Sequence, residues 1–493
     1  MSTDEVLLGA LLVVPSLGGL LTLLARSGRG ALLLMCVTVF GWTVVAAVSV
    51  GTVFTQVSLH STKGWFFLDG LSAYNLMVMA IIYGLSSAFA WRYFGAELEK
   101  GELTLRQARV FSVLWCQALS SMSLVLISNN LAILWIGIEA TTLLTAFLIS
   151  LHTSKVSLEA MWKYLLICSV GVGFAFIGTV ITAAAAIKAG LPVREALLWT
   201  KLLEKASGLD PTLVKASFLF VLVGYGTKAG LAPMHNWLPD AHSQAPAPVS
   251  AIFSGFMLNA ALYCIMRYLP IVEATSGLAG WAREIIGGFG VLSILIAATF
   301  IIFQRDVKRL LAYHSVEHIG IIALGIGLGG LGSFAALFHT LNHSVCKTLS
   351  FFAAGRLGQL YQTHDMSRMN GVLKTSPIWG AGIFGSILAL IGMAPFALFM
   401  SEFQIMRAAV DTHSFVWLGL FLAGASVVFV GALGHALQIA WKPAATQPLP
   451  ERATILDGIL VFLPLGALLL LGLWLPEPLR QAIASAAAVL SPS

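Results

Sequence analysis

The sequence predicts an all-α polytopic membrane protein with about fourteen transmembrane helices. The first observation is composition: 58% of the 493 residues are hydrophobic and 10% are charged, whereas a soluble domain carries roughly a quarter charged residues. The second is a succession of apolar runs that could each cross a bilayer, with no interval that would hold a soluble domain. The third is that the seventh and twelfth runs are interrupted by glycine and proline. We therefore expect lipid to surround most of the chain.

The apolar runs lie near residues 5–25, 30–51, 69–90, 109–128, 130–151, 163–187, 214–233, 247–268, 284–303, 309–329, 331–354, 376–396, 415–441 and 454–475. No basic segment precedes the first run, so we expect a retained helix and not a cleaved signal peptide. Basic residues are most frequent in the short loops on one side, for example Arg92, Lys155 and Arg305. The positive-inside rule then predicts a multi-pass protein of a bacterial cell inner membrane with both termini periplasmic.

The two interruptions have similar sequences. Gly230-Leu-Ala-Pro233 in the seventh run is echoed by Gly392-Met-Ala-Pro395 in the twelfth. Glycine and proline break a spanning helix, and such a break is tolerated only where the freed backbone groups face protein or water. We predict helix breaks at Pro233 and Pro395, and paired breaks are typical of inverted-repeat transporters. Coincidence is the alternative, because both residue types are common in membrane helices.

Charge and cysteine usage exclude several classes of function. The net charge of +6 comes from basic residues in short loops, so no nucleic-acid partner is expected. The five cysteines occur singly in apolar stretches without the spacing of an iron–sulfur or structural zinc site. We expect no cofactor and no redox centre in this chain.

Glu139 stands in the middle of an apolar run. A carboxylate at that depth costs at least about 3 kcal/mol on insertion scales, so it needs a partner, water or a proton. Lys228, one turn before the first break, is its natural partner. A buried pair whose separation or hydration changes can take up and release a proton. The alternatives are a glutamate that only bonds a neighbouring helix and a static ion pair.

The eleventh run carries His339, His343 and Lys347 at intervals of four residues, which places them on one helix face. The preceding run adds His318, with His314 and Glu317 beside it. A histidine pair four residues apart could bind a metal, but no acidic third ligand follows at useful sequence spacing. A stripe of titratable groups suits a proton relay better, and we predict no metal site.

Two further residues complete the predicted relay. Glu402 follows the second break, where a water-filled opening is easiest to build, although an interfacial glutamate is the alternative. His242 lies in a proline-rich connection after the first break, where it suits proton uptake from one side or acts only as a turn residue.

Three motifs of this sequence together resemble a known family. Lys228-Ala-Gly-Leu-Ala-Pro-Met-His-Asn-Trp-Leu-Pro-Asp-Ala-His242, Asp306-Val-Lys-Arg-Leu-Leu-Ala-Tyr313 and the stretch 339–347 are similar to the antiporter-like proton-conducting membrane subunits of complex I, Mrp antiporters and membrane-bound hydrogenases. The stretches 313–320 and 395–403 most resemble the F-type membrane subunit of hydrogenase-4. The resemblance covers nearly the whole chain.

The resemblance implies two inverted five-helix repeats. It divides the chain into a three-helix segment with an inner loop (1–108), a first repeat (109–268), a second repeat (269–441) and a C-terminal helix (442–493). It implies an ion pair between Glu139 and Lys228, a hydrated axis at His339, His343 and Lys347, and an exit-side role for Glu402. The chain departs from several relatives at Asn259, where they have lysine.

These patterns favour a non-catalytic, proton-translocating subunit of a hydrogenase-4-like or complex I-like oxidoreductase. Its expected partners are other membrane subunits, a soluble redox or hydrogenase module, protons and lipid. A membrane subunit of an inorganic-carbon uptake complex and an Mrp-type cation/proton antiporter subunit are the alternatives. A purely structural anchor would not need so many buried ionisable groups.

Overall fold

The computed structural model describes residues 2–443, 448–449 and 453–491. It is built almost entirely from helices, apart from a two-stranded antiparallel ribbon in which β1 (Leu59–His60) pairs with β2 (Phe67–Leu68). Contacts divide the chain into two units. Unit 1 comprises residues 1–229, 257–286 and 481–493, and unit 2 comprises residues 230–256 and 287–480.

The helices that lie within unit 1 are α1 (Thr3–Leu21), α2 (Gly28–Gln56), α3 (Gly70–Lys100), α4 (Leu105–Ile127), α5 (Leu131–Ile149), α6 (Lys155–Lys188), α7 (Trp199–Glu204), α8 (Pro211–Ala229) and α11 (Leu258–Ala274). Short 3-10 turns follow α1 (Thr22–Leu24) and α7 (Ala206–Gly208).

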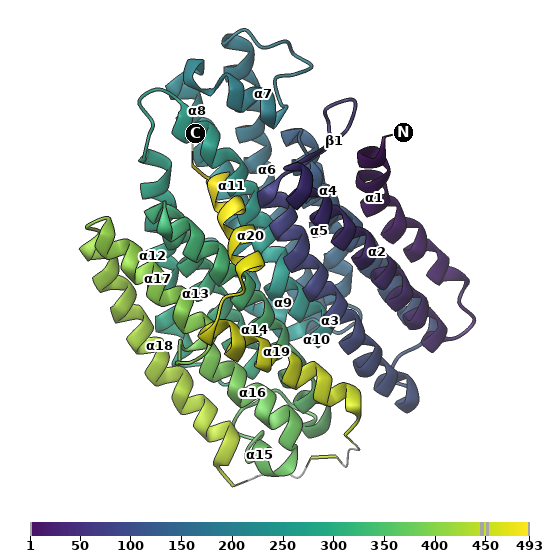
Figure 1. Ribbon diagram of the computed structural model, residues 1–493. Coiled ribbons are helices and arrows are strands. Elements are labelled where there is room, and N and C mark those ends of the chain that lie inside the picture. The colour runs from purple at the N-terminus through teal and green to yellow at the C-terminus, as the bar shows by residue number, and fades with distance from the viewer. Residues whose placement is uncertain (1, 444–447, 450–452, 492–493) are drawn as a thin grey trace. The chain divides into compact units, whose positions relative to one another are not determined.

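The helices that lie within unit 2 are α9 (Trp237–Gln244), α10 (Ala247–Ile252), α13 (Val307–Leu328), α14 (Leu331–Tyr361), α15 (Val372–Thr375), α16 (Pro377–Leu390), α17 (Ala397–Asp411), α18 (Phe415–Trp441) and α19 (Ile455–Leu473). A π-helical turn (Phe253–Met257) joins α10 to α11. Two further helices, α12 (Trp281–Ile301) and α20 (Glu477–Ala488), have residues assigned to both units. Figure 1 labels the helices along the chain.

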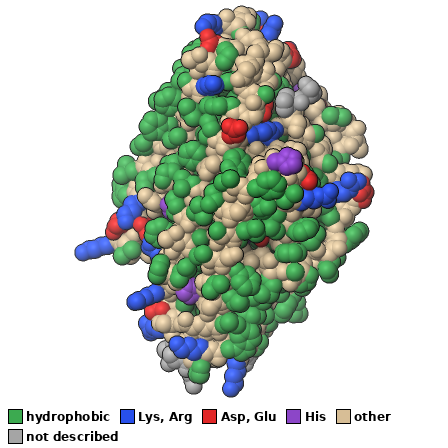
Figure 2. Space-filling model, turned by 90° about the vertical axis from the view of Figure 1, so that its left-hand side faces the viewer, with side chains coloured by type: hydrophobic (Ala, Val, Ile, Leu, Met, Phe, Trp, Pro, Cys, Tyr) green, Lys and Arg blue, Asp and Glu red, His purple; other side chains and the backbone are tan. Residues whose placement is uncertain are grey.

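The predicted fold class is confirmed. A helix occupies each of the fourteen apolar runs, and among the described residues eleven helices are long and apolar enough to cross a membrane. The other three are α8, α14 and α16; α14 carries the histidines and the lysine of the predicted relay, and α16 stops at the second break after 14 residues. Large apolar side chains cover much of the face in Figure 2. Others are exposed elsewhere on the chain, for example Phe40 on α2, which is 72% exposed. Such a surface is stable in lipid and not in water.

Both predicted helix breaks are present. α8 ends at Ala229 and the chain resumes as α9 at Trp237, while α16 ends at Leu390 and the chain resumes as α17 at Ala397. Gly230 and Gly392 follow the broken ends with φ of +78° and +67°, a region that side chains other than glycine rarely adopt. The two breaks therefore repeat each other in conformation as well as in sequence.

Candidate functional site

The first buried polar cluster, which we call the lysine cluster, lies in unit 1 between α5, α6 and α8. It consists of Glu139, Thr142, Thr145, Tyr164, Ser169 and Lys228. Small residues let α6 and α8 approach closely, as transmembrane helices commonly do. A Cβ at Gly224 on α8 would collide with the backbone nitrogen of Ala175 on α6, so the close contact requires glycine.

Lys228 is fully buried at the C-terminal end of α8. Its ammonium donates to the hydroxyl oxygens of Tyr164 at 2.5 Å and Thr142 at 2.9 Å, and it lies 4.6 Å from the centre of the Tyr164 ring. The Tyr164 hydroxyl is also 2.7 Å from Thr145. The lysine is therefore held by neutral oxygens, with added support from the negative end of the α8 dipole.

Glu139 accepts a hydrogen bond of 2.7 Å from the Ser169 hydroxyl. Its second carboxylate oxygen is buried and has no hydrogen-bond partner among the described residues. Lys228 is near enough for an electrostatic interaction, but in the described part of the chain no carboxylate makes an ion pair with it. The ion pair implied by the resemblance is thus not a direct contact, and Tyr164 and Thr142 accept two of the lysine's three donors instead.

The second buried polar cluster, which we call the histidine cluster, lies in unit 2. α13 contributes His314, Glu317 and His318, α14 contributes His339, His343 and Lys347, and α17 contributes Ser401 and Glu402. The two long helices α13 and α14 pack along each other, so the two polar stripes meet. Every one of these residues except Glu402 has less than 4% of its surface exposed.

Hydrogen bonds connect three helices through the histidines. His318 Nδ1 lies 2.9 Å from His339 Nε2, and His339 Nδ1 lies 2.8 Å from the Ser401 hydroxyl. Since each neutral imidazole has one donor and one acceptor nitrogen, this row can carry its hydrogen bonds in either direction. At its other end His318 Nε2 is buried and has no partner among the described residues.

Lys347 and His343 extend the cluster along α14. The Lys347 ammonium donates to the backbone oxygen of Leu311 and lies 5.3 Å from the Phe351 ring. The His343 ring is 5.2 Å from that of His318, and neither of its nitrogens has a partner in the described ranges. Lys347, like Lys228, is buried without a direct carboxylate partner among the described residues.

Glu402 joins this cluster because of the second helix break. The glycine at 392 is adjacent to its carboxylate, and a Cβ there would collide with Oε2. The donor atoms of Glu402, His318 and His339 all lie within 4.8 Å of one another. Sequence spacing alone did not indicate this neighbour, because Glu402 comes from a helix about 60 residues further along the chain than His339.

Two nitrogens of this group lie at the distance of a hydrogen bond. Two imidazole nitrogens bound to one zinc at about 2.0–2.1 Å in tetrahedral geometry are separated by roughly 3.3 Å. The nitrogens of His318 and His339 are 2.9 Å apart, the distance of an ordinary hydrogen bond. A proton on either ring can supply this hydrogen bond.

His242 lies in the α9 segment after the first break, within unit 2. Its ring stacks on Phe351 at 4.9 Å, and neither ring nitrogen has a described partner. Lys308 at the start of α13 donates to the backbone oxygens of Ser243 and Ala245, and Arg309 donates to Asp240 at 2.6 Å. α13 thus holds the segment that carries His242. Phe351, on which the His242 ring stacks, lies one helical turn after Lys347 on α14.

A family model described as "NADH:quinone oxidoreductase/Mrp antiporter, TM" matches residues 128–428, which include every residue of the predicted relay. The chain belongs to this family. It is 37% identical to a hydrogenase-4 component F homolog from Methylacidiphilum infernorum (isolate V4) over 78% of this chain and 80% of that protein. It is 30% identical to hydrogenase-4 component B of Escherichia coli (strain K12) over 72% of this chain and 52% of that longer protein.

Solved structures show the same antiporter-family fold. A chain of the membrane-bound sulfane sulfur reductase, an archaeal respiratory membrane complex, superposes with a TM-score of 0.87 at 22% identity, covering 98% of each chain. A chain of the Mrp complex from Dietzia sp. DQ12-45-1b superposes with a TM-score of 0.86 at 21% identity, covering 99% of this chain and 98% of that one. Both are subunits of multisubunit membrane complexes, and the predicted resemblance is confirmed.

Three side chains of this antiporter-family site were missed by the sequence reasoning. Tyr164 and Thr142 hold Lys228, and Ser401 holds His339. Ser401 could have been noticed because it precedes Glu402. Tyr164 had no comparable signal, since a tyrosine in an apolar helix is ordinarily a core or interface residue.

Proposed function

We propose that this chain is a proton-translocating membrane subunit of a hydrogenase-4-like or complex I-like oxidoreductase. It moves protons through Glu139, Lys228, His242, His318, His339, His343, Lys347 and Glu402, and it works with other membrane subunits and a soluble redox or hydrogenase module. We place it in a bacterial inner membrane with both termini on the periplasmic side, as the basic residues of the short loops favour.

One observation carries the proposal. Each unit buries a lysine that is held by neutral oxygens and has an acidic group nearby but not in contact: Glu139 for Lys228, and Glu317 for Lys347. Burying a charged lysine without a direct ion-pair partner is costly, so its charge can change with small changes of hydration or distance. Buried donors and acceptors without described protein partners, on Glu139 and His343, leave positions for the water that a relay requires.

Function in each unit follows from this arrangement. In unit 1 a proton on Lys228 passes by way of the Tyr164 and Thr142 hydroxyls or intervening water. In unit 2 it passes between Lys347 and the row formed by His343, His318, His339 and Ser401, with Glu402 beside that row. The driving force comes from electron transfer in the partner module.

Purification of the tagged chain from its own membrane tests the assignment. We expect it to copurify with other membrane subunits and a soluble redox or hydrogenase module, and we expect the reconstituted complex to acidify or alkalinise vesicles only when electron donor is supplied. A chain that purifies alone and exchanges sodium for protons would overturn the proposal in favour of an antiporter. Copurification with a carbonic-anhydrase-like protein would overturn it in favour of carbon uptake.

A further inference from the structure

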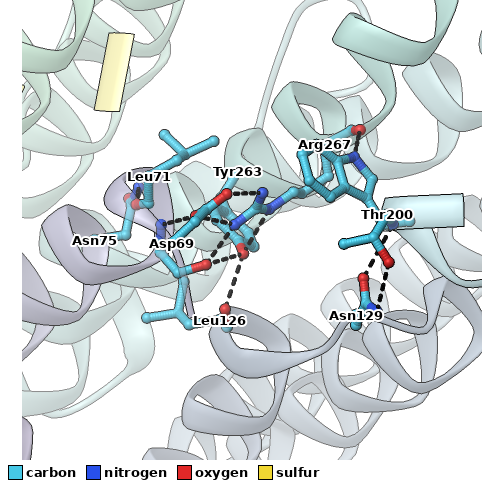
Figure 3. A network of polar contacts seen from close by, with 10 residues as sticks. Asp69, Leu71, Asn75, Leu126, Asn129, Thr200, Tyr263 and Arg267 are labelled. Carbon is cyan, nitrogen blue, oxygen red and sulfur yellow. Dashed lines mark hydrogen bonds and ion pairs between the residues drawn. The ribbon is translucent and has the colours of Figure 1, made fainter. Parts of the chain in front are cut away.

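A third buried polar cluster lies in unit 1, apart from the predicted relay. Arg267 on α11 is 1% exposed and makes two parallel hydrogen bonds to Asp69, the residue that caps α3, with Nη1–Oδ2 and Nη2–Oδ1 distances of 2.7 and 2.6 Å (Figure 3). Ser72 and Tyr263 complete the cluster. Removing one partner of such a buried pair leaves the other charge buried and uncompensated.

Each side chain of this cluster makes at least two hydrogen bonds within unit 1. The Tyr263 hydroxyl donates to the backbone oxygen of Leu126 at 2.9 Å, accepts from Arg267 Nε at 2.8 Å and lies 2.9 Å from the Ser72 hydroxyl. A hydroxyl has one proton to donate and two lone pairs, so three bonds exhaust it. Asp69 Oδ1 accepts both from Arg267 and from the backbone N–H of Ser72.

An indole covers the arginine. The Trp199 ring on α7 lies 4.7 Å from the guanidinium carbon, and its Nε1 donates to the Arg267 backbone oxygen at 2.6 Å. The α7 segment is itself held by Asn129, whose backbone oxygen accepts from Trp199 N at 2.7 Å and whose side chain bonds Thr200 (Figure 3).

The cluster lies at one membrane end of unit 1. α3 begins there, α4 ends there and the connection between α6 and α8 lies there. Asn259, Tyr263 and Arg267 follow each other at intervals of four residues on α11, so a polar stripe leads from the start of this helix to the cluster over about 12 Å.

Proton conduction along side chains needs groups that can accept one proton and release another. Glu139 Oε2 has room for that exchange, because it is buried without a described protein partner. The Arg267 cluster offers fewer such groups: arginine does not deprotonate in proteins, and the Tyr263 hydroxyl and Asp69 Oδ1 already make as many hydrogen bonds as they can. Water would have to displace one of these bonds to reach either atom.

We propose that the Asp69–Arg267–Tyr263–Ser72 cluster, covered by Trp199, is a proton-tight seal that closes one membrane end of unit 1. The proposal rests on the proposed function, because a seal matters only if protons move inside this unit. In this role Arg267 and Tyr263 do not carry protons. They prevent protons from crossing this end of unit 1 passively, without turnover.

Passive proton leak tests the seal in the purified complex, reconstituted in vesicles with a trapped pH-sensitive dye and no electron donor. Tyr263→Phe keeps the ring and removes only the hydroxyl, so we expect it to assemble and to raise the leak rate roughly tenfold, equivalent to about 1.4 kcal/mol of barrier. Tyr268→Phe is the matched control: it is buried on the same helix, and its hydroxyl bonds Thr179 at 2.8 Å, outside the cluster. We expect the control to leak at the wild-type rate.

If the Arg267→Gln complex assembles, its passive proton leak should be faster than that of the Tyr263→Phe complex. If it does not assemble, the leak rate of the Tyr263→Phe complex alone tests the seal. A wild-type leak rate in assembled Tyr263→Phe complex, or an equal leak in Tyr268→Phe, would overturn the seal. This test is separate from that of the proposed function, because the leak is measured without turnover. A Glu139→Gln complex that loses proton pumping but keeps the wild-type leak rate would show an effect on the relay and none on the seal.

Discussion

His318 on α13 and His339 on α14 share a single hydrogen bond, with 2.9 Å between Nδ1 and Nε2. The bond joins two imidazoles that are fully buried, and the far nitrogen of His339 bonds the Ser401 hydroxyl of a third helix. A proton that arrives at one end of this row can leave from the other if the hydrogen bonds reverse. The row is the most direct structural sign of a relay in unit 2.

Replacement of His339 by glutamine should break this row. Glutamine can occupy the site and form hydrogen bonds, but its amide does not accept and release protons near neutral pH. We expect electron-driven proton translocation by the reconstituted complex to fall at least about a hundredfold, the usual scale for loss of a proton-transfer group. His413→Gln, an exposed histidine at the turn between α17 and α18, is the control and should translocate normally. Normal translocation by His339→Gln would remove this residue from the relay.

Replacement of Ser401 by alanine should have a milder effect. It removes one hydrogen bond from His339 and leaves the imidazole in place. A net loss of about 1 kcal/mol corresponds to roughly a fivefold change in the population of the conducting orientation. We therefore expect translocation to fall by a few fold, intermediate between wild type and His339→Gln. An effect as large as that of His339→Gln would contradict a positioning role.

Replacement of Gly392 by alanine should displace Glu402. The added Cβ would meet the carboxylate, and a left-handed conformation costs an L-residue roughly 1–2 kcal/mol. We expect a lower melting temperature for the complex together with impaired translocation. Gly434→Ala on α18 is the control, since nothing lies within 4 Å of its Cβ position and helical alanine is favoured over glycine by about 0.5–1 kcal/mol. Equal behaviour of the two variants would show that position 392 tolerates a side chain.

His152, in the loop between α5 and α6, should make stability depend on pH. The Glu97 carboxylate, 3.1 Å from Nε2, raises the pKa of His152 above its usual value. A raised pKa in the folded state means that the contact stabilises fully below the unfolded-state pKa and that this stabilisation is lost as the pH rises through the folded-state value. We expect the melting temperature to fall over that window.

The His152→Gln complex should lose the part of the pH dependence that this contact supplies. Melting curves recorded between about pH 6 and pH 9 would show a flatter profile for the variant than for wild type. His413→Gln again serves as the control with the wild-type profile. A variant profile that is identical to wild type would show that the Glu97–His152 contact contributes nothing to the pH dependence.

The sequence predicted the helices from the length of the apolar runs, and it predicted the polar stripes on them from local periodicity. Glu139, Lys228 and the His339–Lys347 stripe could be identified since charge in an apolar helix is costly wherever that helix packs. What local periodicity cannot predict is which helix faces which. Tyr164, rather than Glu139, holds Lys228, and Glu402 reaches the histidines only through the bend at Gly392. The partners Asp69 and Arg267 are separated by 198 residues and have no sequence signal that links them.

The number of protons translocated per electron by a Lys228→Met complex tests the central claim most directly. Methionine preserves much of the buried volume but cannot hold a proton, so we expect this ratio to fall to near zero in a complex that still assembles. Lys215→Met, an exposed lysine on the same helix, should keep the wild-type ratio. A wild-type ratio in assembled Lys228→Met complex would contradict the claim that buried ionisable side chains of this chain carry the protons.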